Sequence, residues 1–118
     1  MKRDLDLMRQ IMFDLEAKTS YIVDSYSLYP VNDREYQTKI YFHLRLLEDA
    51  GYIKLGDVTM MGGFPNVKIV FITNAGYDFL RLTRDDKLWK LAHPLILKAG
   101  AIASVTTIQQ IVANLLAK

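Results

Sequence analysis

The stretch HLRLLEDAGYI, residues 43–53, encodes the end of a helix that passes directly into a strand. Its leucines recur at helical spacing, and Gly51 stands where a helix often ends on a left-handed residue. Tyr52 then begins a β-rich run that continues to Val58. The stretch therefore predicts a helix that packs on a core through its leucines and leads straight into a hairpin.

Upstream, the pattern extends this helix back to residue 33, with Asn32 or Asp33 as its N-cap. A first helix is predicted over residues 4–18, capped by Asp4. Between the two helices, the segment from Tyr21 to Tyr29 favours a short strand. The core face of the second helix consists of Tyr36, Ile40, His43, Leu44 and Leu47.

Downstream, a second β-rich run over residues 67–72 completes the hairpin. The glycines and the proline in residues 60–65 predict a loop longer than a two-residue turn. Thr73 is the expected cap of a third helix over residues 74–92, and Pro94 is expected to mark a break or a kink near His93. A last helix follows over residues 104–116.

This order predicts an α+β fold, a winged helix-turn-helix with a two-strand wing and extra C-terminal helices. A single hairpin is marginally stable on its own, so the wing must pack on the helices. We assign residues 1–93 to the winged-helix domain. Residues 94–118 form a C-terminal helical extension and a possible dimerisation element.

Two resemblances support this expectation. Residues 43–53 resemble the end of the recognition helix in ArsR-like and MarR-like winged-helix repressors. Four segments together resemble a family of phage and prophage proteins of unknown function, which implies a winged-helix-like fold and a phage or bacterial setting. They are MKRDLDL (1–7), the HL segment (43–44), ITNAGYDFL (72–80) and RDDKLW (84–89).

Composition narrows the functional classes. The chain has 118 residues, a net charge of +2 and no cysteine, which suits one compact domain without disulfides or thiolate chemistry. His43 is expected to pack in the core and His93 to stand near a helix end, so no metal, cofactor or catalytic site is predicted. With no signal peptide or membrane span expected, we predict a cytoplasmic protein.

The leading hypothesis is a DNA-binding transcriptional regulator whose second helix enters the major groove of double-stranded DNA. The alternative interpretation is that the polar residues on the outer face of this helix are simply exposed to solvent. Tyr41, Phe42, Glu48 and Asp49 weaken the hypothesis, since phosphate contacts need basic groups. The DNA-binding candidates are Arg34, Gln37, Thr38, Lys39, Tyr41, Arg45, Lys54 and Lys68.

The rival hypothesis is a protein–protein interaction module on the same scaffold, without DNA binding. Its first basis is the apolar hairpin tip, which either folds back onto the domain or marks an interface. Its second is the aromatic pair Tyr41 and Phe42, which stands where polar base-reading residues are expected. The amphipathic last helix either covers the core of its own chain or joins two copies in a homodimer, as terminal helices do in many winged-helix regulators. The interface candidates are Met60, Met61, Phe64, Ile108, Ile111, Val112 and Leu115.

Overall fold

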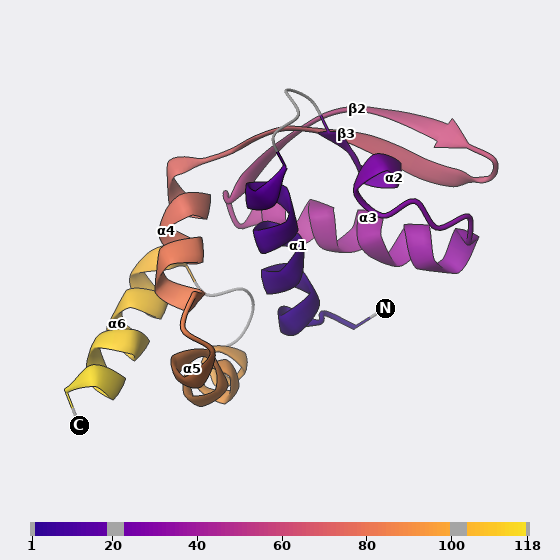
Figure 1. The fold of residues 1–118 in the computed structure, drawn as a ribbon. Coiled ribbons are helices and arrows are strands. Elements are labelled where there is room, and N and C mark those ends of the chain that lie inside the picture. The colour runs from indigo at the N-terminus through magenta and orange to yellow at the C-terminus, as the bar shows by residue number, and fades with distance from the viewer. Residues whose placement is uncertain (1, 19–22, 100–103, 118) are drawn as a thin grey trace.

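The computed structural model describes residues 2–18, 23–99 and 104–117, which form an α+β fold (Figure 1). The helices begin at polar side chains: Asp4, Asp33 and Thr73 each accept a hydrogen bond from a backbone N–H of the first turn, as predicted. The helices are α1 (Leu5–Ala17), α2 (Ser25–Leu28), α3 (Arg34–Asp49), α4 (Asn74–Thr83), α5 (Asp86–Lys98) and α6 (Val105–Leu116), and the strands are β1 (Val23–Asp24), β2 (Ile53–Met61) and β3 (Phe64–Ile72).

The sheet is antiparallel, with strand order β1-β3-β2. Gly51, at a φ of 84°, lets the chain turn from α3 directly into β2. The long β2–β3 hairpin lies over α2 and α3, while α1 crosses beneath it (Figure 1). Helices α4, α5 and α6 pack together at the end of the molecule away from the hairpin tip.

The predicted hairpin loop is wrong in length. Strand β2 continues to Met61 and β3 begins at Phe64, so Gly62 and Gly63 alone form the turn, at φ values of 59° and 95°. Two glycines at positive φ suit the tight turn that matches strand twist. Pro65 is accommodated within β3 because it lies beyond the part of β3 that pairs with β1, at a free edge.

The segment predicted as a short strand holds two kinds of structure. Val23 and Asp24 pair with Ile69 and Lys68 of β3, whereas residues 25–28 form one helical turn. The Asp24 carboxylate caps that turn by accepting from Ser27 N–H, at 2.7 Å. Residues 21 and 22 of the predicted strand lie outside the described residues.

The predicted third helix is two helices, because the chain breaks at Arg84. Arg9 donates to the carbonyl oxygens of Thr83 and Arg84, which satisfies the end of α4. Asp85 then caps α5 by accepting from Leu88 N–H. Of the predicted break or kink at Pro94, the break is wrong, since α5 continues through this residue to Lys98.

His43 is part of the core, as predicted. It is fully buried, and its Nε2 accepts a hydrogen bond from Asp4 N–H at 3.0 Å. Its Nδ1 lies 2.7 Å from the Lys39 carbonyl oxygen, so the ring is neutral with the proton on Nδ1. The ring thereby fixes the start of α1 against α3.

Candidate functional site

The exposed side of α3 is set by the residues that the helix buries. Ile40, His43, Leu44 and Leu47 are fully buried between the sheet and α1. This leaves Arg34 and Lys39 exposed on the N-terminal half of the helix. Thr38 is half-buried, and its hydroxyl donates to the Arg34 carbonyl oxygen at 2.7 Å.

Gln37 does not face the solvent, contrary to its selection as a base-reading residue. Its side chain is 0% exposed, and Nε2 donates to the carbonyl oxygens of Tyr29 and Val31, at 2.7 and 2.8 Å. These carbonyls belong to the loop between α2 and α3, which makes no regular backbone ladder. Gln37 therefore uses its amide donors on the loop carbonyls and is unavailable to a nucleobase.

Arg45 and Tyr41 are engaged with each other and with the hairpin. The Arg45 guanidinium lies over the Tyr41 ring, donates to its hydroxyl at 2.9 Å and pairs with Glu48 at 3.0 Å. The bond to Tyr41 raises the pKa of Arg45, burial lowers it, and the bond to Glu48 raises it further. Glu48 also accepts from Leu55 N–H of β2. This network ties α3 to the hairpin instead of presenting Arg45 as a free cation.

Lys39 is joined by two basic residues that sequence reasoning missed. Lys2 and Arg3 are exposed and line, with Lys39, one surface hollow of about 310 Å3. The rest of its lining is Asp4, Leu5, Asp6, His93 and Leu97. The two basic residues precede the Asp4 cap, and only the packing of α1 on α3 through His43 brings them to Lys39. No short-range pattern in the sequence signals this approach.

The two carboxylates in this hollow already have protein partners. Asp4 Oδ1 accepts from Leu7 N–H as the helix cap. Asp6 accepts from the indole N–H of Trp89 at 2.7 Å, and its other oxygen lies 3.6 Å from His93 Nε2. The hollow therefore holds three cations and two carboxylates, which leaves an excess of one formal positive charge among these five side chains.

Lys54 and Lys68 lie on a different surface. Both are exposed, and they alternate along their strands with the buried Ile53, Leu55 and Ile69. Because successive side chains of a strand point to opposite faces, these lysines are on the outer face, away from α3. The sheet separates them from Arg34 and Lys39, so the structure does not gather the basic candidates into one surface.

The hairpin tip is partly folded onto the domain. Phe64 is only 2% exposed and stacks on Tyr26 of α2, with the ring centroids 5.9 Å apart. Asn66 accepts hydrogen bonds from Ser25 and from Tyr26 N–H, which holds the hairpin down beside this ring pair. Phe64 is therefore not an exposed interface residue, whereas Met60 is 70% and Met61 40% exposed.

The candidates on α6 separate into two groups. Ile108 and Val112 are buried in the core of their own chain, so they are unavailable to a partner. Ile111 and Leu115 are half-buried and line a groove of about 410 Å3 between α5 and α6. The predicted boundary between residues 93 and 94 lies within α5.

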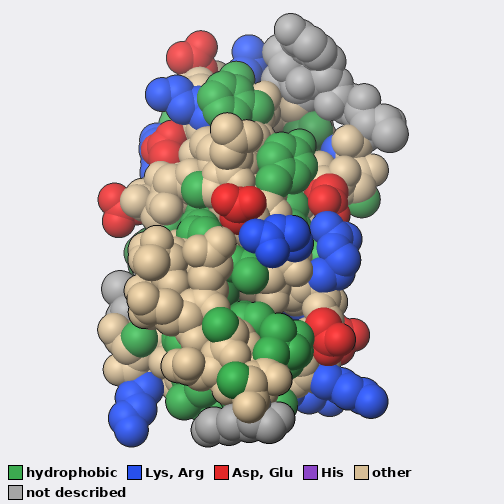
Figure 2. All heavy atoms as spheres, turned by 90° about the vertical axis from the view of Figure 1, so that its left-hand side faces the viewer, with side chains coloured by type: hydrophobic (Ala, Val, Ile, Leu, Met, Phe, Trp, Pro, Cys, Tyr) green, Lys and Arg blue, Asp and Glu red, His purple; other side chains and the backbone are tan. Residues whose placement is uncertain are grey.

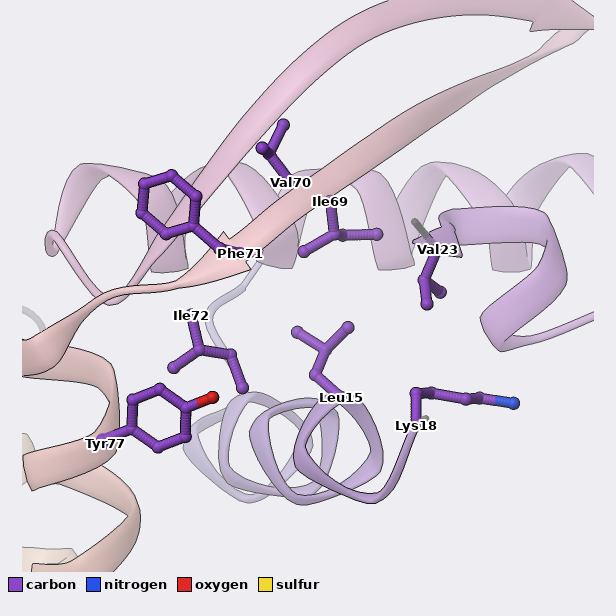
Figure 3. A pocket seen from close by; sticks show the side chains of 8 residues that line it. All are labelled: Leu15, Lys18, Val23, Ile69, Val70, Phe71, Ile72 and Tyr77. Carbon is purple, nitrogen blue, oxygen red and sulfur yellow. The ribbon is translucent and has the colours of Figure 1, made fainter. Parts of the chain in front are cut away.

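A further hollow, of about 160 Å3, lies between the end of α1, β1, β3 and the start of α4 (Figure 3). Leu15, Val23 and Ile72 point toward its centre, and the Lys18 amine extends away from it. Lys18 and Tyr77 are the two titratable residues of its lining, and the other six residues are hydrophobic. Across residues 2–18, 23–99 and 104–117, no three His, Asp or Glu side chains cluster as a metal ion requires.

None of the helices in the described part of the chain has both the length and the apolar character needed to cross a bilayer. Residues 2–102 match the family described as hypothetical protein DUF2513, and the chain belongs to this family. Helix α6 lies outside the matched residues. No curated protein and no solved structure matches the chain significantly.

Proposed function

We propose that this protein is a DNA-binding, non-catalytic winged-helix regulator of phage or prophage origin. The fold assignment is supported by the element order α1-β1-α2-α3-β2-β3 and by the sheet order β1-β3-β2. In that arrangement the helix before the hairpin is the one that meets the major groove. Helix α2 is a single turn, which departs from the usual helix-turn-helix pair. This function would place the protein in the cytoplasm with its DNA.

The observation that carries the proposal is the basic surface formed by Lys2, Arg3 and Lys39. Arg34 and Lys39 project from the N-terminal half of α3, and Lys2 and Arg3 lie beside Lys39. Non-specific affinity for duplex DNA comes mainly from basic side chains that neutralise phosphates. With Gln37 buried and Arg45 paired, this surface favours contacts to phosphates over direct reading of bases.

Charge reversal tests the surface against a matched control. Lys39→Glu should weaken binding to a random 20-base-pair duplex by about tenfold or more and flatten its salt dependence. Lys68→Glu makes the same change in charge at an exposed lysine on the outer face of the sheet, and should have a smaller effect. Equal losses from both variants would show that general charge, and not this surface, governs binding.

The rival function is a protein-interaction module, and the exposed Met60 at the hairpin tip favours it. Contiguous exposed apolar side chains commonly mark contact surfaces for another protein. Since Phe64 is buried, the informative substitution is Met60→Asp, which leaves the Phe64–Tyr26 stack in place. This function predicts that a protein partner copurifies with the intact protein and is lost from Met60→Asp. It also predicts that the intact protein has no affinity for DNA. Micromolar, salt-sensitive DNA binding by the intact protein would count against it.

A further inference from the structure

A groove between α5 and α6 offers an apolar surface that the described residues of the chain leave open. Leu95 of α5 and Ile111 and Leu115 of α6 line it. Leu95 is 42% exposed, and Leu91, one turn earlier on the same face of α5, is also exposed. Removing apolar surface of this kind from water lowers the free energy, which favours its burial against a partner.

The charge pattern of α6 indicates what covers the groove. Residues 104–117 contain no Asp, Glu, Lys, Arg or His. The lower half of Figure 2, where α6 is toward the viewer, is formed by hydrophobic and uncharged side chains, with charged ones at the margins. A two-fold interface brings identical residues from two copies together, so a charged residue at its centre would be repelled by the same charge on the other copy. A helix without charge avoids that repulsion.

We propose that a second copy of this chain occupies the groove, with α6 of each copy packed against α5 and α6 of the other about a two-fold axis. Ile111 and Leu115 are the central contacts, Leu91 and Leu95 extend them along α5, and Lys98 stays at the rim. This inference is independent of DNA binding, since the basic surface around Lys39 is formed by other residues.

The size of the surface sets the expected affinity. Helix α6 has 12 residues, a length of about 18 Å. Stable interfaces commonly bury about 800 Å2 per partner, and a helix of this length with the flanking leucines is at the low end of that range. Interfaces of the standard size range from micromolar to picomolar affinity, and we expect this smaller one to form a reversible dimer at the weak, roughly micromolar end.

Sedimentation velocity over a range of about 1–200 μM tests the proposal, with two matched variants on α5. Leu95→Glu places a charge in the groove, while Leu97→Glu places one at a 52% exposed leucine outside it. The intact chain and Leu97→Glu should approach twice the 13.6 kDa monomer mass at the top of the range. Leu95→Glu should raise the dissociation constant by about tenfold or more.

Three results would overturn the proposal: a monomer at every concentration of the intact chain, dimers in both variants, or loss of the dimer in both. Circular dichroism checks that each variant is folded. If Leu95→Glu is not folded, Asn114→Arg replaces it, because Asn114 is an exposed polar residue of the same groove. Dimerisation of Asn114→Arg at the affinity of the intact chain would then refute the assignment.

Discussion

Substituting Gln37 by glutamate separates a structural role for this residue from a role in reading bases. The change keeps the size of the side chain but replaces the Nε2 donor by an acceptor. In the native protein Nε2 donates to two carbonyl oxygens at 2.7 and 2.8 Å, inside the fold. A carboxylate there would face two acceptors while deprived of water, so the new carboxyl group must take up a proton.

The loss in the free energy of unfolding follows from that protonation. Holding a glutamic acid with an ordinary pKa of about 4.3 in its neutral form at pH 7 costs about 3.7 kcal/mol. The neutral acid has one donor where the amide has two, so one hydrogen bond worth about 1 kcal/mol is also lost. The raised folded-state pKa makes the penalty grow as pH rises above about 4.3. Gln37→Glu should therefore lower the free energy of unfolding by about 4–5 kcal/mol at pH 7 and about 2 kcal/mol at pH 5.

Urea denaturation at both pH values measures this difference, and Gln109→Glu, at an exposed position of α6, is the control for the charge change. The control should stay within about 0.5 kcal/mol of the native protein. Equal stability of Gln37→Glu and the native protein at both pH values, with weakened DNA binding, would show that Gln37 faces solvent and reads bases.

Three further predictions concern the packing that positions α3 and the hairpin. Gly76→Ala should destabilise the protein by about 2 kcal/mol or more in urea denaturation, because the new Cβ would lie 2.1 Å from the Tyr52 carbonyl oxygen, although alanine favours helix. Asn74→Ala, at an exposed position of the same helix, is the control, and a Gly76→Ala variant more stable than the native protein would contradict the packing. His43→Ala should cost about 2–4 kcal/mol by the same assay, since it leaves a cavity and the Asp4 N–H without its acceptor, and a cost below about 1 kcal/mol would argue against the buried ring. Burial raises the pKa of Tyr52 to about 12, so the stabilisation linked to its neutral phenol should be lost between pH 10 and 12; an ordinary ionisation midpoint near 10 in the ultraviolet absorbance of this tyrosine would contradict its burial.

Local rules predicted much of the fold. Asp4, Asp33 and Thr73 cap helices because a short polar side chain can reach the first-turn N–H groups, which is visible in the sequence. Gly51 ends α3 for an equally local reason. The hairpin loop was misjudged because Met60 and Pro65 pair across the strands, and pairing depends on the partner strand.

At the candidate site, the structure differs from the sequence-based predictions because of contacts between segments that are distant in the sequence. The sequence places Gln37 among the solvent-facing residues of this helix, whereas in the structure its Nε2 donates to the loop carbonyls of Tyr29 and Val31 and the side chain is buried. The stacking of Phe64 on Tyr26 depends on where the hairpin lies over α2. The approach of Arg3 to Lys39 likewise depends on tertiary packing, which periodicity does not encode.

The central claim is that the basic surface beside α3 binds the phosphates of duplex DNA, and its salt dependence tests it most directly. Affinity of the intact protein for a random duplex should be measured from about 50 to 200 mM salt. Contacts through Lys2, Arg3 and Lys39 predict that the logarithm of the association constant falls with the logarithm of salt concentration with a slope of about −2.7. The absence of binding at 50 mM salt, or a slope near zero, would contradict the claim.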